Sequence, residues 1–271
     1  IPTDRILISA THTHSAPSAM ACLGSRVDPA YAEFLPGRIV TSIIEAEKKL
    51  QPARAGWTVI TDEKHNHCRR WIFRPDRMMT DPFGVASVRA HMHPGYQSAN
   101  HIGPSGPADT DLSLLSIQTL DGKPLAVLAN YAMHYFGSPL ISGDFCGRFG
   151  RALRQQIGLN DSSGFVGVMS QGTSGDSMWM DYSLPAWDGN LDTYTAEVAK
   201  AAFEGYRKIE YRTEITLAMA EAKLSLRRRV PDEARLNWAK EVAEKVGNRL
   251  PRGWSEVYAF EAIDLHNHPT A

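Results

Sequence analysis

Short apolar runs alternate with helix-like segments along most of this chain. Apolar runs bounded by turn residues predict buried strands, whereas apolar positions three and four apart predict amphipathic helices. This alternation is typical of layered α/β folds, so we expect a mostly parallel or mixed central sheet flanked by helices. The expected strands are 6–10, 55–61, 112–119, 125–133, 165–169 and 215–226, and the expected helices are 31–50, 147–157, 191–209 and 231–246. Pro36 should interrupt the first helix.

Three of the expected strands run directly into polar clusters. Strand 6–10 leads into His12 and His14, strand 125–133 leads into His134, and strand 165–169 leads into a loop that holds Asp176 and Ser177. Ligands bind open α/β sheets at the carboxyl ends of the strands. A lone histidine at a strand end more often has a local structural role, but three clusters at equivalent positions favour one shared site.

Most histidines of the chain occur as His-X-His pairs, and only one pair follows an expected buried strand. In an extended chain, His12 and His14 point to the same face. Imidazole is the commonest zinc ligand and also transfers protons near neutral pH, so this pair predicts a metallohydrolase. The pairs at 65/67 and 91/93 fall in a long irregular region, 65–111, and exposed histidines are common in such loops. Long loops in a compact domain are often functional, so we expect this region to form one wall of the site.

Composition and charge argue against a nucleic-acid partner and a transmembrane segment. The chain has 271 residues, with 29 Lys plus Arg against 30 Asp plus Glu, so its net charge indicates no nucleic-acid partner. No run reaches the roughly 18 apolar residues of a transmembrane segment. Its three cysteines lack metal-ligand spacing and are expected to be buried free thiols. We expect residues 1–271 to form a single α/β domain of a longer chain.

A resemblance to a known family begins at residues 10–17. They read Ala-Thr-His-Thr-His-Ser-Ala-Pro, which resembles the Thr-His-Thr-His-Ser-Gly-Pro signature of the neutral/alkaline ceramidases, zinc-dependent amidases that cleave N-acyl sphingoid bases. Three later stretches follow in the family's order: 121–134, 141–144 and 164–176. The last of these is similar to the strand and loop that hold the family's Gly-Asp-Val-Ser-Pro-Asn motif. The resemblance covers residues 5–180.

The resemblance implies a residue set for amide hydrolysis with Zn²⁺ as cofactor. His12 and His134 are implied as zinc ligands, and His14 as an unligated group for proton transfer or oxyanion binding. Arg69 stands where the family has an arginine that contacts the substrate carbonyl, with Arg70 as the alternative. The implied substrate is a small-molecule or lipid-like amide, and the family alone suggests a secreted or periplasmic protein. The sequence gives no basis for an oligomeric state.

The sequence departs from the family pattern at two places. The family's serine falls at Met178, so either Ser177 takes its place or this branch lacks the serine. Trp179 and Met180 replace the family's Pro-Asn, which predicts different pocket walls and a substrate other than ceramide. The family also completes its zinc shell with a Glu and a Tyr from a later segment that has no match here. Zinc sites normally have three or four protein ligands, so we expect the remaining ligands beyond this chain's C-terminal segment.

Two other interpretations remain open at this stage. A His-X-His at a strand end also occurs in amidohydrolase-type and phosphoesterase sites, where Asp144 and Asp176 would be further ligands. A degenerate family member would keep the fold without the metal, as a binding module. Metal content, together with hydrolysis of amides, esters and phosphoesters, distinguishes these classes.

Overall fold

The computed structural model describes residues 2–268, which divide into two compact units. Unit 1 consists of the chain up to Ala16, Leu50–Met78 and Arg89–Ala218; unit 2 consists of Pro17–Lys49, Met79–Val88 and the residues from Met219 onward. All the candidate site residues belong to unit 1. The expectation that the chain forms a single domain stays a prediction.

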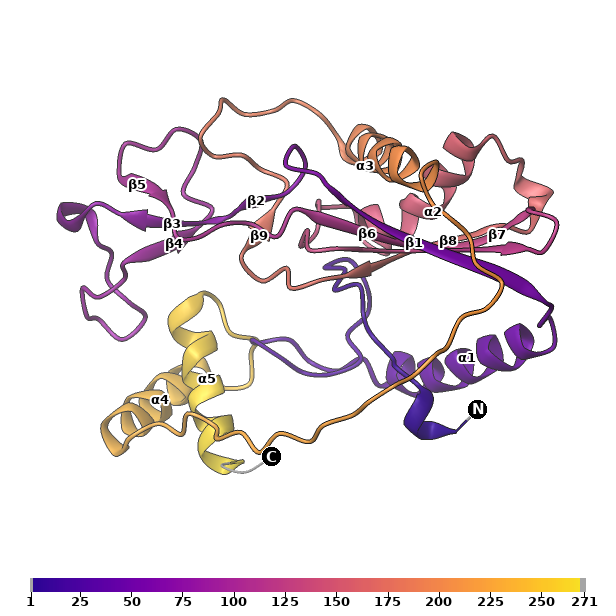
Figure 1. The fold of residues 1–271 in the computed structure, drawn as a ribbon. Helices are drawn as coiled ribbons and strands as arrows, with labels where there is room; N and C mark the ends of the chain where they lie inside the picture. The colour runs from indigo at the N-terminus through magenta and orange to yellow at the C-terminus, as the bar shows by residue number, and fades with distance from the viewer. Residues whose placement is uncertain (1, 269–271) are drawn as a thin grey trace. The chain divides into compact units, whose positions relative to one another are not determined.

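The helices and strands follow one another in an order that mixes both types (Figure 1). In chain order the elements are η1 (Thr3–Arg5), α1 (Pro29–Glu47), β1 (Ala53–Thr61), β2 (His67–Cys68), β3 (Arg70–Phe73), η2 (Pro75–Arg77), β4 (Ala90–Met92), β5 (His101–Pro104), β6 (Asp111–Thr119), β7 (Pro124–Tyr131), α2 (Asp144–Ile157), η3 (Asp161–Ser163), β8 (Val166–Gln171), β9 (Ser177–Met178), α3 (Leu191–Tyr206), α4 (Glu233–Val246) and α5 (Trp254–Asn267).

The central sheet of unit 1 has four strands in the order β1-β6-β7-β8. β1 pairs antiparallel with β6, β6 pairs antiparallel with β7 through a tight turn, and β7 pairs parallel with β8. Gly122 in that turn has a φ of 93°, a conformation that glycine adopts without steric cost. The expected α/β class with a mixed central sheet is therefore confirmed. Two smaller sheets, β4-β3-β5 and β2-β9, extend unit 1.

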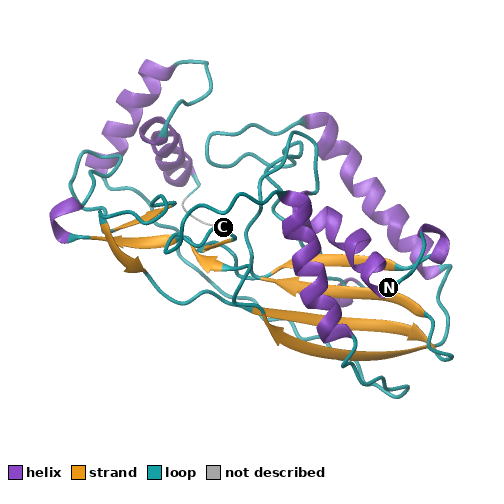
Figure 2. Cartoon of the chain, turned by 90° about the horizontal axis from the view of Figure 1, so that it is seen from above, coloured by secondary structure: helices purple, strands orange, loops and turns teal. Residues whose placement is uncertain are grey.

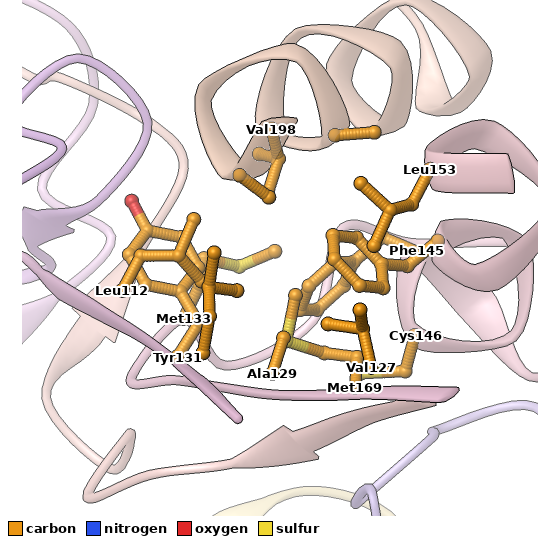
Figure 3. Packing of buried hydrophobic residues seen from close by; sticks show 14 of the residues in the cluster. Leu112, Val127, Ala129, Tyr131, Met133, Phe145, Cys146, Leu153, Met169 and Val198 are labelled. Atoms are coloured by element: carbon orange, nitrogen blue, oxygen red, sulfur yellow. The ribbon is translucent and has the colours of Figure 1, made fainter. Parts of the chain in front are cut away.

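One face of the central sheet is covered by α2 and α3 (Figure 2). Burial alternates along β6 and β7, so every second side chain enters the core. In Figure 3, Val127, Ala129 and Tyr131 of β7 pack with Phe145 of α2 and Val198 of α3. Each fully buried large apolar side chain contributes about 1.5–3 kcal/mol to folding, so this cluster anchors the strand ends that carry the site.

The local sequence explains where the two core helices begin and end. Asn190 caps α3 by accepting hydrogen bonds from the backbone amides of Asp192 and Thr193. α2 ends at Gly158, which has the left-handed φ of 82° common at helix C-termini. α2 begins three residues earlier than expected, with Gly143 as its N-cap, and the Gly147 amide donates to the Gly143 carbonyl at 2.8 Å.

Unit 2 contains α1, α4 and α5. Ala239 of α4 and Ala259 of α5 are fully buried where the two helices pack together. Phe83 contacts Trp238 edge to face, and the Arg235 guanidinium lies 3.6 Å from the Phe83 ring centre. The expected interruption of α1 at Pro36 is wrong, because proline keeps a helical φ and removes only one backbone hydrogen bond.

Two of the expected strands are also wrong. Residues 6–10 form no strand, Leu7 and Ile8 are 83% and 65% exposed, and both neighbours of β7 in the sheet are other strands, β6 and β8. Residues 215–226 are extended and exposed, without a pairing partner among the described residues. An apolar or alternating run has the same sequence pattern whether or not a neighbouring strand is available. No helix in the described part of the chain has the length and hydropathy required to cross a bilayer.

Candidate metal centre

The segment with His12 and His14 is held in place by hydrogen bonds rather than by a sheet. The Thr13 hydroxyl donates to the carbonyl of Ser142 at 2.6 Å, and the Ser142 amide donates to the carbonyl of Ser15 at 2.9 Å. The Ser15 hydroxyl donates to the carbonyl of Ser138 at 3.0 Å. These bonds tie the 13–15 segment to the loop between β7 and α2, which begins next to His134.

His12, His14 and His134 form one cluster. One ring nitrogen from each lies within 4.8 Å of the others, and the Nε2 atoms of His12 and His14 are 3.0 Å apart. His134 is buried, whereas the other two rings are exposed, so the cluster opens to solvent on one side. Tyr135 stacks on the His14 ring at a centroid distance of 3.8 Å and restricts its orientation. The sequence prediction that the two histidine motifs meet is therefore matched by the geometry.

His134 has one unprotonated nitrogen, Nε2, which lies 3.4 Å from Nη2 of Arg69. Its Nδ1 lies 3.0 Å from the carbonyl oxygen of Ser174, and since a carbonyl only accepts, Nδ1 carries the proton. Burial, together with the nearby Arg69 guanidinium, lowers the pKa of His134 to about 4. The ring is consequently neutral at pH 7, with the lone pair on Nε2. Such backbone support of the second nitrogen is the usual arrangement around histidine ligands.

Arg69 lies beside the cluster and is itself buried. Its Nε and Nη2 donate to the carbonyl of Gly175 at 3.1 and 2.7 Å, and Nη2 lies 3.4 Å from Nε2 of His134. Burial lowers the pKa of Arg69 from its ordinary value, although a guanidinium stays charged in proteins. The site therefore combines a cation with three imidazoles. Arg70, the alternative, is an exposed residue of β3.

Asp144 organises the loop that follows His134. Its carboxylate accepts hydrogen bonds from the backbone amides of Phe136, Gly137 and Phe145 at 2.7 to 2.9 Å. Because these amides occupy its oxygens, Asp144 acts as a structural anchor in this conformation rather than as a metal ligand. It has a φ of 55°, and His12 has the same value. Such left-handed backbone is uncommon outside glycine and clusters at functional sites.

Asp176 and Ser177 lie beside the segment that holds Arg69, because β9 pairs with β2. Neither residue belongs to the histidine cluster. The carbonyl of Asp176 accepts the backbone amide of Arg69 at 2.8 Å. Ser177 pairs with Cys68 across β9 and β2, and its side chain is 1% exposed, with no hydrogen-bond partner for Oγ among the described residues. Their catalytic roles stay predictions.

The cluster fits a zinc ion. Zn–N bonds of about 2.0–2.1 Å place two nitrogens of a tetrahedral site roughly 3.3 Å apart. The 3.0 Å between the His12 and His14 nitrogens is close to that spacing, and a ring nitrogen of His134 lies within 4.8 Å of both. The exposed side of the cluster leaves room for further ligands or a substrate. His14, expected as unligated, is equally placed to act as a third ligand.

Two histidines that looked like exposed loop residues have other roles. His93 lies with Nε2 3.4 Å from Nη1 of Arg69, and its Nδ1 is 2.5 Å from the Tyr182 hydroxyl. His65 is buried between Asp62 and Glu197, with 2.8 and 2.9 Å from its nitrogens to their oxygens. The only sequence signal for either was membership of a His-X-His pair in a long loop, which does not reveal a distant partner.

Comparisons with known proteins give distant likenesses. No protein-family model matches the chain, and no curated protein matches it. Among solved structures, the chain is similar to neutral ceramidase from Pseudomonas aeruginosa, with 19% identity and a TM-score of 0.40 over 63% of this chain and 24% of that one. It is also similar to a ceramidase complexed with C2, with 21% identity and a TM-score of 0.47 over 74% and 29%. The chain spans less than a third of either structure.

Proposed function

We propose that this protein is a zinc-dependent hydrolase of a carbonyl substrate, of the ceramidase-like amidase type. The observation that carries the proposal is the meeting of His12, His14 and His134 beside the buried Arg69. The preference for an amide rests on the sequence motif at residues 10–17 and its companions. The chemistry requires a metal-binding group of imidazoles and a cation for developing negative charge, and this site offers both.

Each residue would have a separate role in that reaction. His12 and His134 would hold the metal, and the Ser174 carbonyl would keep His134 in the required tautomer. When bound, zinc supplies an activated water and polarises a carbonyl. Arg69 would bind the substrate's carbonyl oxygen as negative charge develops there, since a fixed donor in a partly dry site acts strongly. His14 would take up and return a proton.

The first experiment measures zinc by elemental analysis in the protein and in His12→Ala and His134→Ala variants. We expect about one zinc per chain in the protein and loss of most of it in both variants. His67→Ala is the matched control, because His67 contacts the carbonyl of Lys64 and lies outside the cluster. Absence of zinc, or retention of zinc in both cluster variants, would overturn the proposal.

A second experiment separates the activity from the metal. Fluorogenic amides, esters and phosphoesters are tested with the zinc-loaded protein and with Arg69→Ala. We expect amide hydrolysis that falls by about 10²–10³ in Arg69→Ala, the usual cost of losing a transition-state donor. His14→Ala distinguishes its two roles: retained zinc with lost activity supports proton transfer, and lost zinc supports ligation. Phosphoester hydrolysis alone would replace the amidase assignment by a phosphoesterase.

A further inference from the structure

A second cavity lies in unit 1, apart from the histidine cluster. Its volume is about 320 Å³, and none of the three cluster histidines lines it. Aromatic rings form much of its wall: Trp179 and Trp187 meet edge to face at a centroid distance of 5.8 Å, and Tyr96 and Tyr194 also line it. Phe136 stacks on one face of Trp179 at a centroid distance of 4.5 Å, whereas Trp187 is 41% exposed, so the open aromatic surface of this wall is that of Trp187. Trp179 and Met180, expected to form walls of the substrate pocket, line this separate cavity.

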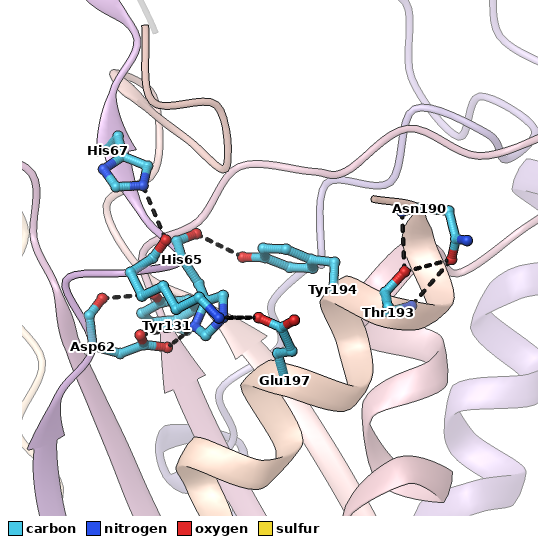
Figure 4. A network of polar contacts seen from close by, with 9 residues as sticks. Asp62, His65, His67, Tyr131, Asn190, Thr193, Tyr194 and Glu197 are labelled. Carbon is cyan, nitrogen blue, oxygen red and sulfur yellow. Dashed lines mark hydrogen bonds and ion pairs between the residues drawn. The ribbon is translucent and has the colours of Figure 1, made fainter. Parts of the chain in front are cut away.

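The polar side of this cavity is built around His65 (Figure 4). His65 is held between the carboxylates of Asp62 and Glu197, and both of its nitrogens face acceptors, so the ring is stable as a cation. Lys64 forms an ion pair with Glu197 at 2.5 Å. The carbonyl of His65 accepts the Tyr194 hydroxyl at 2.9 Å, which fixes this wall. These four charged groups compensate one another.

Two further carboxylates make the net charge of the cavity lining negative. Glu63 and Asp181 line the same cavity, and within residues 2–268 neither belongs to a salt bridge. Asp181 accepts hydrogen bonds from the amide and hydroxyl of Ser183 through one oxygen. The lining thus has an excess of negative charge beside aromatic faces. This is an environment that attracts a cation and repels a carboxylate.

We infer that this cavity binds an organic ammonium group attached to a small apolar body. The ring quadrupole of the exposed Trp187 attracts a cation over its face, and the carboxylates of Glu63 and Asp181 add to that field. A primary, methylated or quaternary amine satisfies both surfaces at once. The site does not depend on the metal or on the proposed hydrolysis.

Calorimetric titration with choline and with its neutral carbon isostere, the alcohol in which carbon replaces nitrogen, tests this assignment. The two molecules have the same shape and differ in charge. We expect choline to bind about tenfold more tightly, since a desolvated cation–π contact contributes up to about that factor. Equal affinity for the two, or no binding of choline at millimolar concentration, would overturn the inference.

Three variants assign the binding to this cavity. Trp187→Leu removes an aromatic face and should weaken choline binding about tenfold, whereas Trp187→Phe should keep most of it. Trp57→Leu is the matched control, because Trp57 is exposed and lines no part of this cavity. Circular dichroism confirms folding of each variant. Weakening by Trp57→Leu that equals the effect of Trp187→Leu would show that choline binds elsewhere.

Discussion

The position of Arg69 depends on partners from several other segments of the chain. The Gly175 carbonyl accepts two of its nitrogens, and His93 faces a third. Because Nε2 of His93 must accept from the guanidinium, Nδ1 carries the proton and donates to the Tyr182 hydroxyl at 2.5 Å. The hydroxyl of Tyr182 then donates to the Met180 sulfur at 2.9 Å. This chain of hydrogen bonds fixes the direction of the guanidinium.

We predict that His93→Ala loosens Arg69 without removing it. The guanidinium keeps its bonds to the Gly175 carbonyl but loses a support on one side, so the expected fall in kcat/KM is about tenfold, less than for Arg69→Ala. Hydrolysis of a fluorogenic amide measures the effect, and zinc content should stay unchanged. Tyr182→Phe, which removes only the hydroxyl, should give a smaller effect in the same direction. A His93→Ala variant with full activity would exclude a positioning role.

His65 makes the stability of unit 1 depend on pH. Burial alone would lower its pKa, but hydrogen bonds to Asp62 and Glu197 outweigh this and raise the pKa above the ordinary 6.5. A group whose pKa is raised on folding stabilises the protein fully below its unfolded pKa, and this contribution is lost as the pH rises through the folded pKa. His65→Gln should therefore destabilise most at about pH 6 and progressively less at higher pH.

Urea denaturation between about pH 6 and 9 measures this difference in the free energy of unfolding. His67→Gln, whose ring contacts a backbone carbonyl, provides the control and should show a nearly constant difference. A difference for His65→Gln that is independent of pH would contradict a cationic His65. The lowered pKa of Glu197, caused first by its hydrogen bond to Lys64 and then by the one to His65, acts in the acidic range instead.

At the scale of elements, hydrophobic periodicity predicted the core well. The hairpin of β6 and β7, the strand β8 and the helices α2 and α3 all appear near their expected positions because each buries an apolar face. The wrong strands at 6–10 and 215–226 are extended but unpaired. Pairing depends on which neighbour is free, and a local pattern contains no information about that.

The site was predictable where a residue follows a periodic element or belongs to a family-like motif. His134 follows β7, and its role was accessible from that strand. His12 was chosen for two reasons, its place after the expected strand 6–10 and the family-like motif at residues 10–17; the strand is absent, so only the motif remains as support. His93 and the Ser174 carbonyl were missed, since their contacts cross 24 and 40 residues of chain between irregular segments. Such contacts require the tertiary structure.

The packing of α2 on the sheet depends on two glycines. A Cβ atom added at Gly150 of α2 would lie 2.2 Å from the carbonyl oxygen of Gly167 in β8, so backbone approaches backbone here. We predict that Gly150→Ala lowers the free energy of unfolding by about 1–3 kcal/mol through overpacking. Gly147→Ala on the same helix meets nothing within 4 Å and should be neutral or slightly stabilising. Urea denaturation of both variants checks this; equal effects would show that α2 can move away from β8.

For the whole molecule, the site depends on unit 1 alone. His12, Arg69 and His134 come from three separate stretches of the chain, all within that unit. Unit 2 has its own small apolar cluster between α4 and α5. The chain passes from unit 1 to unit 2 for the last time near residue 218, through a segment without a helix or strand among residues 213–232. This connection has neither the regular secondary structure nor the burial of the packed parts of both units.

That connecting segment should be the first site of tryptic cleavage. Proteases cleave chain that can bind in an extended form without breaking packing or hydrogen bonds, and residues 221–230 are all exposed. Lys223 and Arg227 should therefore be cut before Lys200, which is also exposed but lies within α3. Limited trypsin digestion followed by mass spectrometry gives the order of cleavage. If Lys200 is cut as early as Lys223, α3 opens locally as easily as the connection, and the firm packing of α3 against the sheet would be disproved.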